Sequence, residues 1–274
     1  MSYKTITYRV DDRVAVITLN RPERMNAMSL ELCGEVKHAV RAADDDGDVR
    51  VVIVTGAGGK AFSAGYDISE ADQDEKRGRR TVADWSERLN HDLDYTYVMW
   101  NCRKPVIAMI NGYCLAGGLE LVQMCDIRYC SDDSKFGVVE TRFSSGVATL
   151  AMPWIVGARC REYIYTGDMF GAEEALRIGL VNRVFAKADL EKETIKIAKR
   201  MSRVALAALQ WNKRAVNTTF EAMGFNAAMQ YGVEACSLLD ATETPEFKAF
   251  EEIRKAKGLT EAIKWRRALF APYE

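Results

Sequence analysis

The sequence predicts an α/β fold that passes into a helical segment in the last third of the chain. In the first two-thirds, short apolar or β-branched runs alternate with amphipathic segments, which is typical of strand-and-helix units. From about residue 190 onward the patterns are helical. The 274 residues are 48% hydrophobic, enough for one large core. One domain with an added helical segment is therefore favoured over two independent domains.

The chain is expected to begin with a β-hairpin. Residues 3–9 and 13–19 are rich in β-branched side chains, and Asp11-Asp12 would form the turn between them. Ser29 is expected to cap a helix, and Val51 to Val54 indicates a short buried strand. The apolar face of the first helix would consist of Leu32, Val36, Ala39, Val40 and Ala43.

A glycine-rich loop and a charged segment come next. Gly56 to Glu70 follows a strand but lacks the Gly-Lys-Ser/Thr ending of a phosphate-binding P-loop. We interpret it as an ordinary turn or as the source of a backbone N–H donor near Gly65-Tyr66. Residues 70–82 are highly charged and indicate either a solvated loop or a flap over a site. A helix is expected from about Val82 to Trp100.

The stretch from Asn111 to Glu140 is the candidate site. It follows the apolar run 106–110, and its glycines 117 and 118 are expected to open a short buried helix, followed by a strand that delivers Glu140. The first amides of a helix have no partner within it, and its dipole favours negative charge there. The Gly117 N–H is therefore a candidate donor to an oxyanion. The alternative is that the glycines only allow close packing.

Glu120 lies in this short helix without an opposite charge three or four residues away. A buried carboxylate without a partner costs several kcal/mol. Glu120 is therefore expected either to take part in chemistry or to reach water or a distant arginine.

Beyond Glu140 the patterns are mainly helical. A glycine at 179 would stop a helix, Asp189 would cap one, and Thr244-Pro245 and Gly258 would begin and end another. The expected helices cover 149–156, 159–165, 171–178, a segment after 189, 205–222, 225–239 and 245–257, with a strand at 180–184.

Composition excludes several function classes. The net charge of −1 argues against a nucleic-acid partner. The seven cysteines are odd in number and form no CxxC pair, which indicates reduced, packed thiols in a reducing compartment. Two histidines argue against a multi-histidine metal site. We found neither a signal peptide nor an apolar stretch long enough for a membrane, so a cytoplasmic location is expected.

Five blocks resemble the crotonase superfamily, the enoyl-CoA hydratase/isomerase family. They are NRPERMNAM, AFSAGYDI, NGYCLAGGLELVQMCD, FGVVET and GDMFGAEEALRIGLVNRV. They follow the family's order and cover roughly residues 3–190; beyond them only FKAFEEIRKAKG matches, loosely. The resemblance implies a crotonase (ClpP/crotonase-like) spiral of ββα units over residues 1–195, which holds the acyl-CoA site. It also implies a C-terminal helical trimerisation segment over 196–274, and assembly as a homotrimer or as a homohexamer built from two trimers.

By motif position, the resemblance implies which residues bind the substrate, an acyl-CoA thioester. The backbone N–H groups of Tyr66 and Gly117 would form the oxyanion hole for the thioester oxygen. Arg21 and Arg24 would either meet CoA phosphates or lie on the surface. Coenzyme A is part of the substrate, so no separate cofactor and no metal is implied. The remaining substrate-binding positions are Met25, Ala27, Ala64, Asp67, Ile68 and Ser69.

Glu120 and Glu140 fall where hydratases of the family carry two catalytic glutamates. Adding water to a 2-enoyl-CoA needs a base at C3 and an acid at C2; by family analogy Glu120 activates the water and Glu140 protonates C2. The resemblance thus favours an enoyl-CoA hydratase, a hydro-lyase typical of fatty acid metabolism. An isomerase, an acyl-CoA hydrolase, a C–C lyase and a non-catalytic RNA-associated homologue remain alternatives.

The sequence departs from common hydratases at two places. After Glu140 it reads TRFSSGVATLAMPW, which keeps only Gly146 of a loop that is rich in proline and glycine in many hydratases. Tyr66 is bulkier than the alanine of common fatty acyl hydratases. Its side chain either shapes an acyl pocket or faces outward, with only its backbone used.

Overall fold

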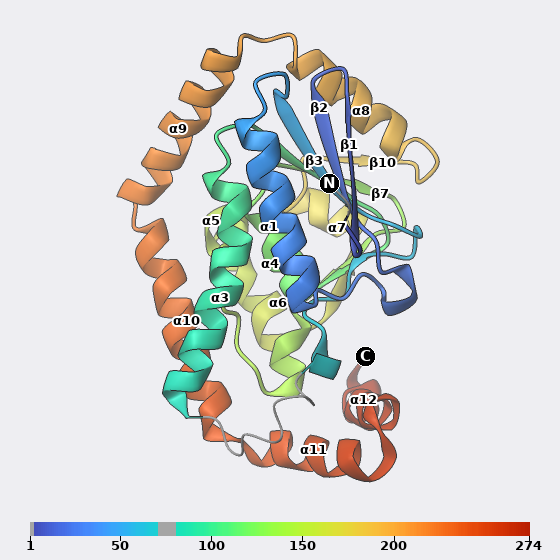
Figure 1. Ribbon diagram of the computed structural model, residues 1–274. Coiled ribbons are helices and arrows are strands. Elements are labelled where there is room, and N and C mark those ends of the chain that lie inside the picture. The colour runs from blue at the N-terminus through green and yellow to red at the C-terminus, as the bar shows by residue number, and fades with distance from the viewer. Residues whose placement is uncertain (1–2, 71–80) are drawn as a thin grey trace.

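The computed structural model describes residues 3–70 and 81–274 and has two sheets flanked by helices (Figure 1). The large sheet has the order β1-β2-β3-β5-β7-β10; β1 and β2 pair antiparallel and the other neighbours are parallel. Its strands are β1 (Ile6–Asp11), β2 (Val14–Leu19), β3 (Val51–Gly56), β5 (Val106–Ile110), β7 (Ile127–Ser131) and β10 (Arg183–Phe185).

A smaller sheet has the order β4-β6-β8-β9. Its first three strands, β4, β6 and β8, each follow in the chain directly after a parallel strand of the large sheet, namely β3, β5 and β7. Only β9 runs antiparallel to its neighbour. Its strands are β4 (Ala61–Ser63), β6 (Tyr113–Leu115), β8 (Lys135–Gly137) and β9 (Met169–Gly171).

Helices cover both faces of the large sheet, which explains why β3 is buried at every residue. Residues such as Ile17 and Val54 face the cluster that contains residues of α1 (Leu30–Asp45) and α3 (Val82–Asn101). Their neighbours, such as Val16, face α8 (Leu190–Met201). Position 195, the end of the expected core, thus lies within a helix that packs on this sheet.

Of the remaining helices, α9 and α10 run along one edge of the molecule, and α11 and α12 lie at the bottom of the view (Figure 1). α10 packs along α3, and α11 and α12 pack on each other. The helices are α4 (Gly117–Gln123), α5 (Met152–Val156), α6 (Cys160–Thr166), α7 (Ala172–Arg177), α9 (Leu206–Ala222), α10 (Phe225–Thr242), α11 (Pro245–Lys257) and α12 (Leu259–Ala268). Short 3-10 helices are η1 (Pro22–Arg24), η2 (Ile68–Glu70), η4 (Val139–Phe143), η5 (Gly157–Arg159) and η6 (Ala271–Tyr273).

Several sequence predictions are confirmed. The N-terminal hairpin forms, and Ser29 caps α1 by accepting a hydrogen bond from the amide of Leu32 (3.2 Å). The predicted apolar face of α1 is buried. Thr244 caps α11, and Gly258 follows its end. All seven cysteines are buried, and none forms a disulfide bond.

Other predictions were wrong in detail. The hairpin turn is Asp12-Arg13, because these two residues, and not Asp11, adopt positive φ (48° and 68°). Asp189 precedes α8 but makes no side-chain cap. The strand expected at 180–184 spans Arg183–Phe185, and α12 was not anticipated. Glu140 lies on η4 and not on a strand. The expected charged loop at 70–82 falls largely on residues 71–80, outside the described part of the chain.

Candidate active site

The site begins where α4 meets the smaller sheet. α4 starts at Gly117, and Ala116 before it has φ 51° and ψ −133°, a conformation that alanine rarely adopts. A Cβ at Gly118 would lie 2.8 Å from the carbonyl oxygen of Ser63. The glycine pair therefore does serve close packing, and that packing brings the first turn of α4 against the loop after β4.

Tyr66 lies in the loop after β4, and Gly117 is the first residue of α4. A Cβ added at Gly65, which has φ +99°, would be 3.3 Å from the Gly117 nitrogen. Within residues 3–70 and 81–274, no backbone acceptor binds either the Tyr66 or the Gly117 amide. Two neighbouring N–H groups without internal acceptors are what an oxyanion hole requires.

The side chain of Tyr66 points inward. Its hydroxyl donates to the carbonyl oxygen of Asp92 (3.3 Å), and its ring packs edge-on against Tyr95, with 6.5 Å between centroids. A Cβ at Gly117 would lie 2.6 Å from Cδ2 of this ring. Burial raises the pKa of Tyr66 well above its usual value, so the phenol stays neutral. The outward orientation considered from the sequence is not observed.

Residues 25–28 pair with residues 64–67 and bring the expected CoA-contacting positions together. The Ala64 amide donates to the Met25 carbonyl (3.0 Å), and the Asp67 amide donates to that of Met28 (3.1 Å). Asn26 organises this turn: its side-chain amide donates to the carbonyls of Ala57 and Ala61 (3.0 and 2.8 Å). Met25, Ala27 and Ala64 are all partly exposed beside Tyr66.

Asp67 and Arg21 form an ion pair (2.8 Å) at the rim of this region. Although burial opposes it, hydrogen bonds from Ser69 and Arg21 lower the pKa of Asp67 below its usual value. Arg21 also donates to the carbonyl of Ala27 (2.6 Å) and thus supports the loop rather than extending into solvent. Ile68, in contrast, is half-exposed.

Glu120 lies in the first turn of α4 and is only 4% exposed. Its Oε1 accepts a hydrogen bond from the backbone amide of Thr149 (3.1 Å), and its Oε2 is buried without a partner among the described residues. The Thr149 hydroxyl pairs in turn with that of Thr96 on α3 (3.1 Å). Burial raises the pKa of Glu120 to about 7, although the Thr149 hydrogen bonds oppose the shift. The partner that the sequence could not supply is thus a backbone amide.

Glu140 approaches from η4. Burial, and then the charge of Glu120, raise the pKa of Glu140 well above its usual value. Its Oε2 is buried and has no partner in the described part of the chain. Arg142 holds η4 in place by donating to the carbonyl of Thr166 (3.0 Å), and Phe143 packs edge-on against Phe250 of α11 (5.6 Å).

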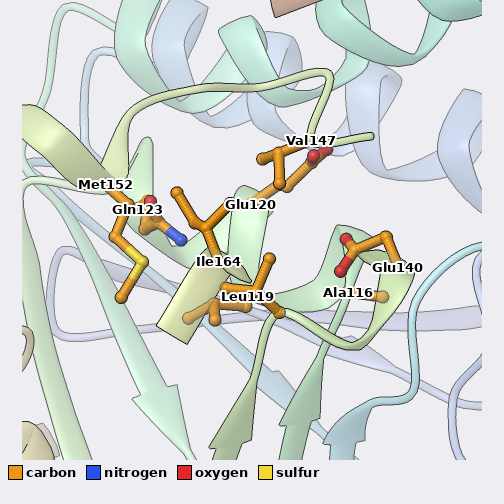
Figure 2. Close-up of a pocket in the computed structure, with 9 residues that line it drawn as sticks. Ala116, Leu119, Glu120, Gln123, Glu140, Val147, Met152 and Ile164 are labelled. Atoms are coloured by element: carbon orange, nitrogen blue, oxygen red, sulfur yellow. The ribbon is translucent and has the colours of Figure 1, made fainter. Parts of the chain in front are cut away.

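The two glutamates line one cavity of about 10 Å³, close to the smallest space that holds a water molecule (Figure 2). Figure 2 shows the carboxyl groups of Glu120 and Glu140 on one side and the amide of Gln123 on the other, beside Met152. The lining residues are Ala116, Leu119, Glu120, Gln123, Val138, Glu140, Val147, Met152 and Ile164. At neutral pH, burial therefore favours the protonated form of Glu140. Glu120, with a pKa of about 7, is present in both its protonated and its ionised form.

Metal sites and membrane spans are both absent from residues 3–70 and 81–274. This part of the chain contains no cluster of three or more acidic, histidine or cysteine side chains suited to a metal ion. It also contains no helix with the length and apolar character of a membrane span.

Comparison with known proteins assigns the family. The enoyl-CoA hydratase/isomerase family model matches residues 9–257. The chain belongs to this family. Crotonyl-CoA hydratase of Syntrophomonas wolfei is 34% identical over 95% of this chain and 100% of the relative. (E)-Benzylidenesuccinyl-CoA hydratase of Thauera aromatica is also 34% identical, over 91% of this chain and 96% of its own.

Solved structures of the family share the fold. The crystal structure of an enoyl-CoA hydratase/isomerase from Xanthobacter autotrophicus Py2 superposes with a TM-score of 0.92 at 38% identity, covering 98% of this chain and 99% of the other. An enoyl-CoA hydratase from Mycobacterium smegmatis gives 0.90 at 27% identity, covering 98% and 94%. The family resemblance and the crotonase fold expected from the sequence are therefore confirmed.

Proposed function

We propose that this protein is an enoyl-CoA hydratase, which adds water across the 2,3 double bond of a 2-enoyl-CoA thioester. The observation that carries the proposal is that Glu120 and Glu140 line one small cavity. Ala116, which precedes the Gly117 amide, lines it too, and the Tyr66 and Gly117 amides have no backbone acceptor among the described residues. The names of the relatives, crotonyl-CoA hydratase and (E)-benzylidenesuccinyl-CoA hydratase, support the same reaction.

The reaction follows from the positions of these groups. The amides of Tyr66 and Gly117 hold the thioester oxygen as negative charge develops on it. Glu120, whose pKa of about 7 allows it to be ionised, takes a proton from water while the water oxygen bonds to C3. The C2=C3 electron pair moves into the thioester as an enolate, and Glu140 then gives its proton to C2.

In this proposal, two short segments near Tyr66, residues 25–27 and 64–69, complete the substrate site. The backbone of Met25, Ala27 and Ala64 faces the coenzyme A portion of the substrate. Asp67, Ile68 and Ser69 border its entry. Coenzyme A arrives with the acyl group, so the reaction needs no separate cofactor and no metal.

Assembly as a homotrimer or as a dimer of trimers is part of the proposal. Large apolar side chains are exposed on and beside α9 and α10, which run along one edge of the molecule (Figure 1). Exposed apolar surface that gathers on one part of a molecule is typical of protein interfaces. These side chains are Trp211, Val216, Met223, Tyr231 and Leu238. A cytoplasmic location remains a prediction of the sequence.

Product identification tests the reaction. Crotonyl-CoA and longer 2-enoyl-CoA esters are incubated with the protein, and the products are separated by mass. A gain of one water without loss of coenzyme A is expected. Free coenzyme A, or a shifted double bond without a change in mass, would instead show hydrolysis or isomerisation.

Glu120→Gln and Glu140→Gln test the carboxyl pair. Each is expected to lower kcat by about 10²- to 10⁴-fold, because an amide cannot exchange the proton. Both folded-state pKa values are raised, so the charged carboxyls cost stability that grows as the pH rises from the unfolded value of 4.5. The variants should therefore melt at or above the wild-type temperature at about pH 8. Full activity in both variants would refute the mechanism.

A further inference from the structure

Gln123 is a buried polar side chain that the proposed reaction does not use. It lies in the last turn of α4, three residues after Glu120, and is 5% exposed. Its Oε1 is buried without a hydrogen-bond partner among the described residues. A buried amide oxygen without a donor is costly, because it has lost its hydrogen bond to water.

The position of Gln123 in the cavity indicates why an unpaired amide oxygen is kept there. Gln123 lines the same cavity as the two glutamates, and Figure 2 shows its amide on the side away from their carboxyl groups. Its neighbours in the lining, Met152 and Ile164, are apolar. A leucine or methionine would fill such a wall without leaving a polar atom unpaired. The amide therefore gives the cavity a polar group on the side away from the two carboxyl groups.

We propose that Gln123 binds a hydroxyl group on the acyl chain of the substrate, next to the carbon that receives water. The inference rests on the proposed function and narrows its substrate class to short 2-enoyl-CoA esters with a neutral hydroxyl substituent. A hydroxyl both donates and accepts, and so matches the amide in either of its orientations.

Size and charge exclude other substituents. The cavity of about 10 Å³ is close in size to a single water molecule, so it suits a hydroxyl group and not a long chain. A carboxylate would meet the negative charge of Glu120 and lose its hydration between Met152 and Ile164. A methyl group would leave the Gln123 oxygen unpaired.

The test compares two substrates of equal length, 4-hydroxy-2-butenoyl-CoA and 2-pentenoyl-CoA, which differ only by a hydroxyl in place of a methyl group. Wild-type protein is expected to hydrate the hydroxylated ester with a kcat/KM at least about tenfold higher. Gln123→Met keeps the side-chain length but removes both polar ends, and should lower this ratio by at least about tenfold. Gln123→Leu serves as a second variant, with folding of both checked by circular dichroism.

Thr194→Val is the matched control. Thr194 lies on α8, is fully buried, and also has a hydroxyl oxygen without a partner among the described residues. Its replacement removes the same kind of buried polar atom outside the cavity lining. The substrate ratio of this variant should equal that of the wild type.

Binding separates this inference from the proposed function. The saturated esters 4-hydroxybutanoyl-CoA and pentanoyl-CoA have no double bond to hydrate or shift. Calorimetry therefore reports their Kd values even if the enzyme is not a hydratase, and a parallel assay for free coenzyme A checks that the thioester stays intact. The hydroxylated ester should bind more tightly to the wild type, and Gln123→Met should abolish the difference. Equal ratios in wild type and Gln123→Met, for both hydration and binding, would overturn the role of Gln123. Failure of the wild type to hydrate any 2-enoyl-CoA would refute only the proposed function.

Discussion

Glu120 and Glu140 are the same chemical group in two environments, and the difference sets their roles. Glu120 keeps a hydrogen bond from the Thr149 amide, which partly offsets burial, whereas Glu140 experiences burial together with the charge of Glu120. The carboxyl with the lower pKa ionises first and leaves the other protonated. In the proposed reaction, Glu120 is thus suited to act as the base and Glu140 as the acid.

The rate should therefore depend on pH in a defined way. Ionisation of Glu120 with a pKa of about 7 predicts that kcat/KM rises as the pH increases through that value. At higher pH, loss of the Glu140 proton should lower it again. A stopped-flow or absorbance assay of hydration across this range checks both limbs. A rate that stays constant from about pH 5 to 8 would contradict the role of Glu120.

Gly117 should tolerate no side chain while Tyr66 is present. Gly117→Ala would place a methyl group 2.6 Å from Cδ2 of the Tyr66 ring and shift the two candidate oxyanion amides. We expect kcat/KM to fall by about 10²- to 10³-fold. Tyr66→Ala removes the ring but keeps its amide, so Gly117→Ala should cost much less in that background. Equal costs in both backgrounds, measured by a double-mutant cycle, would contradict the steric explanation.

Sequence patterns located some of these residues and missed others for physical reasons. Glu120 and Gly117 could be predicted because a lone acid and a glycine pair at a helix start conflict with ordinary packing. Gln123 and Asn26 could not, because the sequence does not show whether a buried amide finds a partner. Asn26 finds two carbonyls, while the Gln123 oxygen finds no donor among the described residues.

Among the helices, the position of Glu140 depends on segments that are distant from it in the sequence. The C-terminal helices pack against η4: Arg266 of α12 donates to the carbonyl of Arg142, and Phe250 packs on Phe143. α12 escaped prediction because Gly258, a stop for α11, also stands at the start of the next helix. A glycine identifies a break in a helix but does not determine whether a second helix begins beyond the break.

A buried lysine, Lys213, links α9 to the core. Lys213 pairs with Asp126 (2.8 Å) and donates to the carbonyls of Met99 and Lys104 (3.1 and 3.2 Å). Lys213→Met should lower the free energy of unfolding by about 2–4 kcal/mol, somewhat less than for a fully buried pair because Asp126 is a quarter exposed.

Urea denaturation measures this loss, and Lys264→Met provides the control. Lys264 forms a largely exposed ion pair with Glu261 on α12, so its replacement should change the free energy of unfolding by no more than about 0.5 kcal/mol. If the two substitutions changed the free energy of unfolding by similar amounts, the buried Lys213–Asp126 pair would contribute no more to stability than an exposed pair.

For the whole molecule, the exposed apolar side chains of α9 and α10 predict self-association. Light scattering should give a mass of about three or six times the 30.8 kDa of one chain. Trp211, 74% exposed on α9, should lie in the contact, so Trp211→Glu should lower the mass. Val10→Glu, at an exposed apolar position on β1, should leave it unchanged. A monomer in the wild type would contradict the proposed assembly.

The burial of all seven thiols also governs how the folded protein responds to electrophiles. Burial raises the pKa of Cys125 and Cys102 to about 12, so almost no thiolate is present at neutral pH. Alkylating or disulfide-exchanging reagents can then modify these sulfurs only after the chain opens. The speed of labelling would report the opening equilibrium of the protein, and a bound ligand that holds the chain closed would slow it.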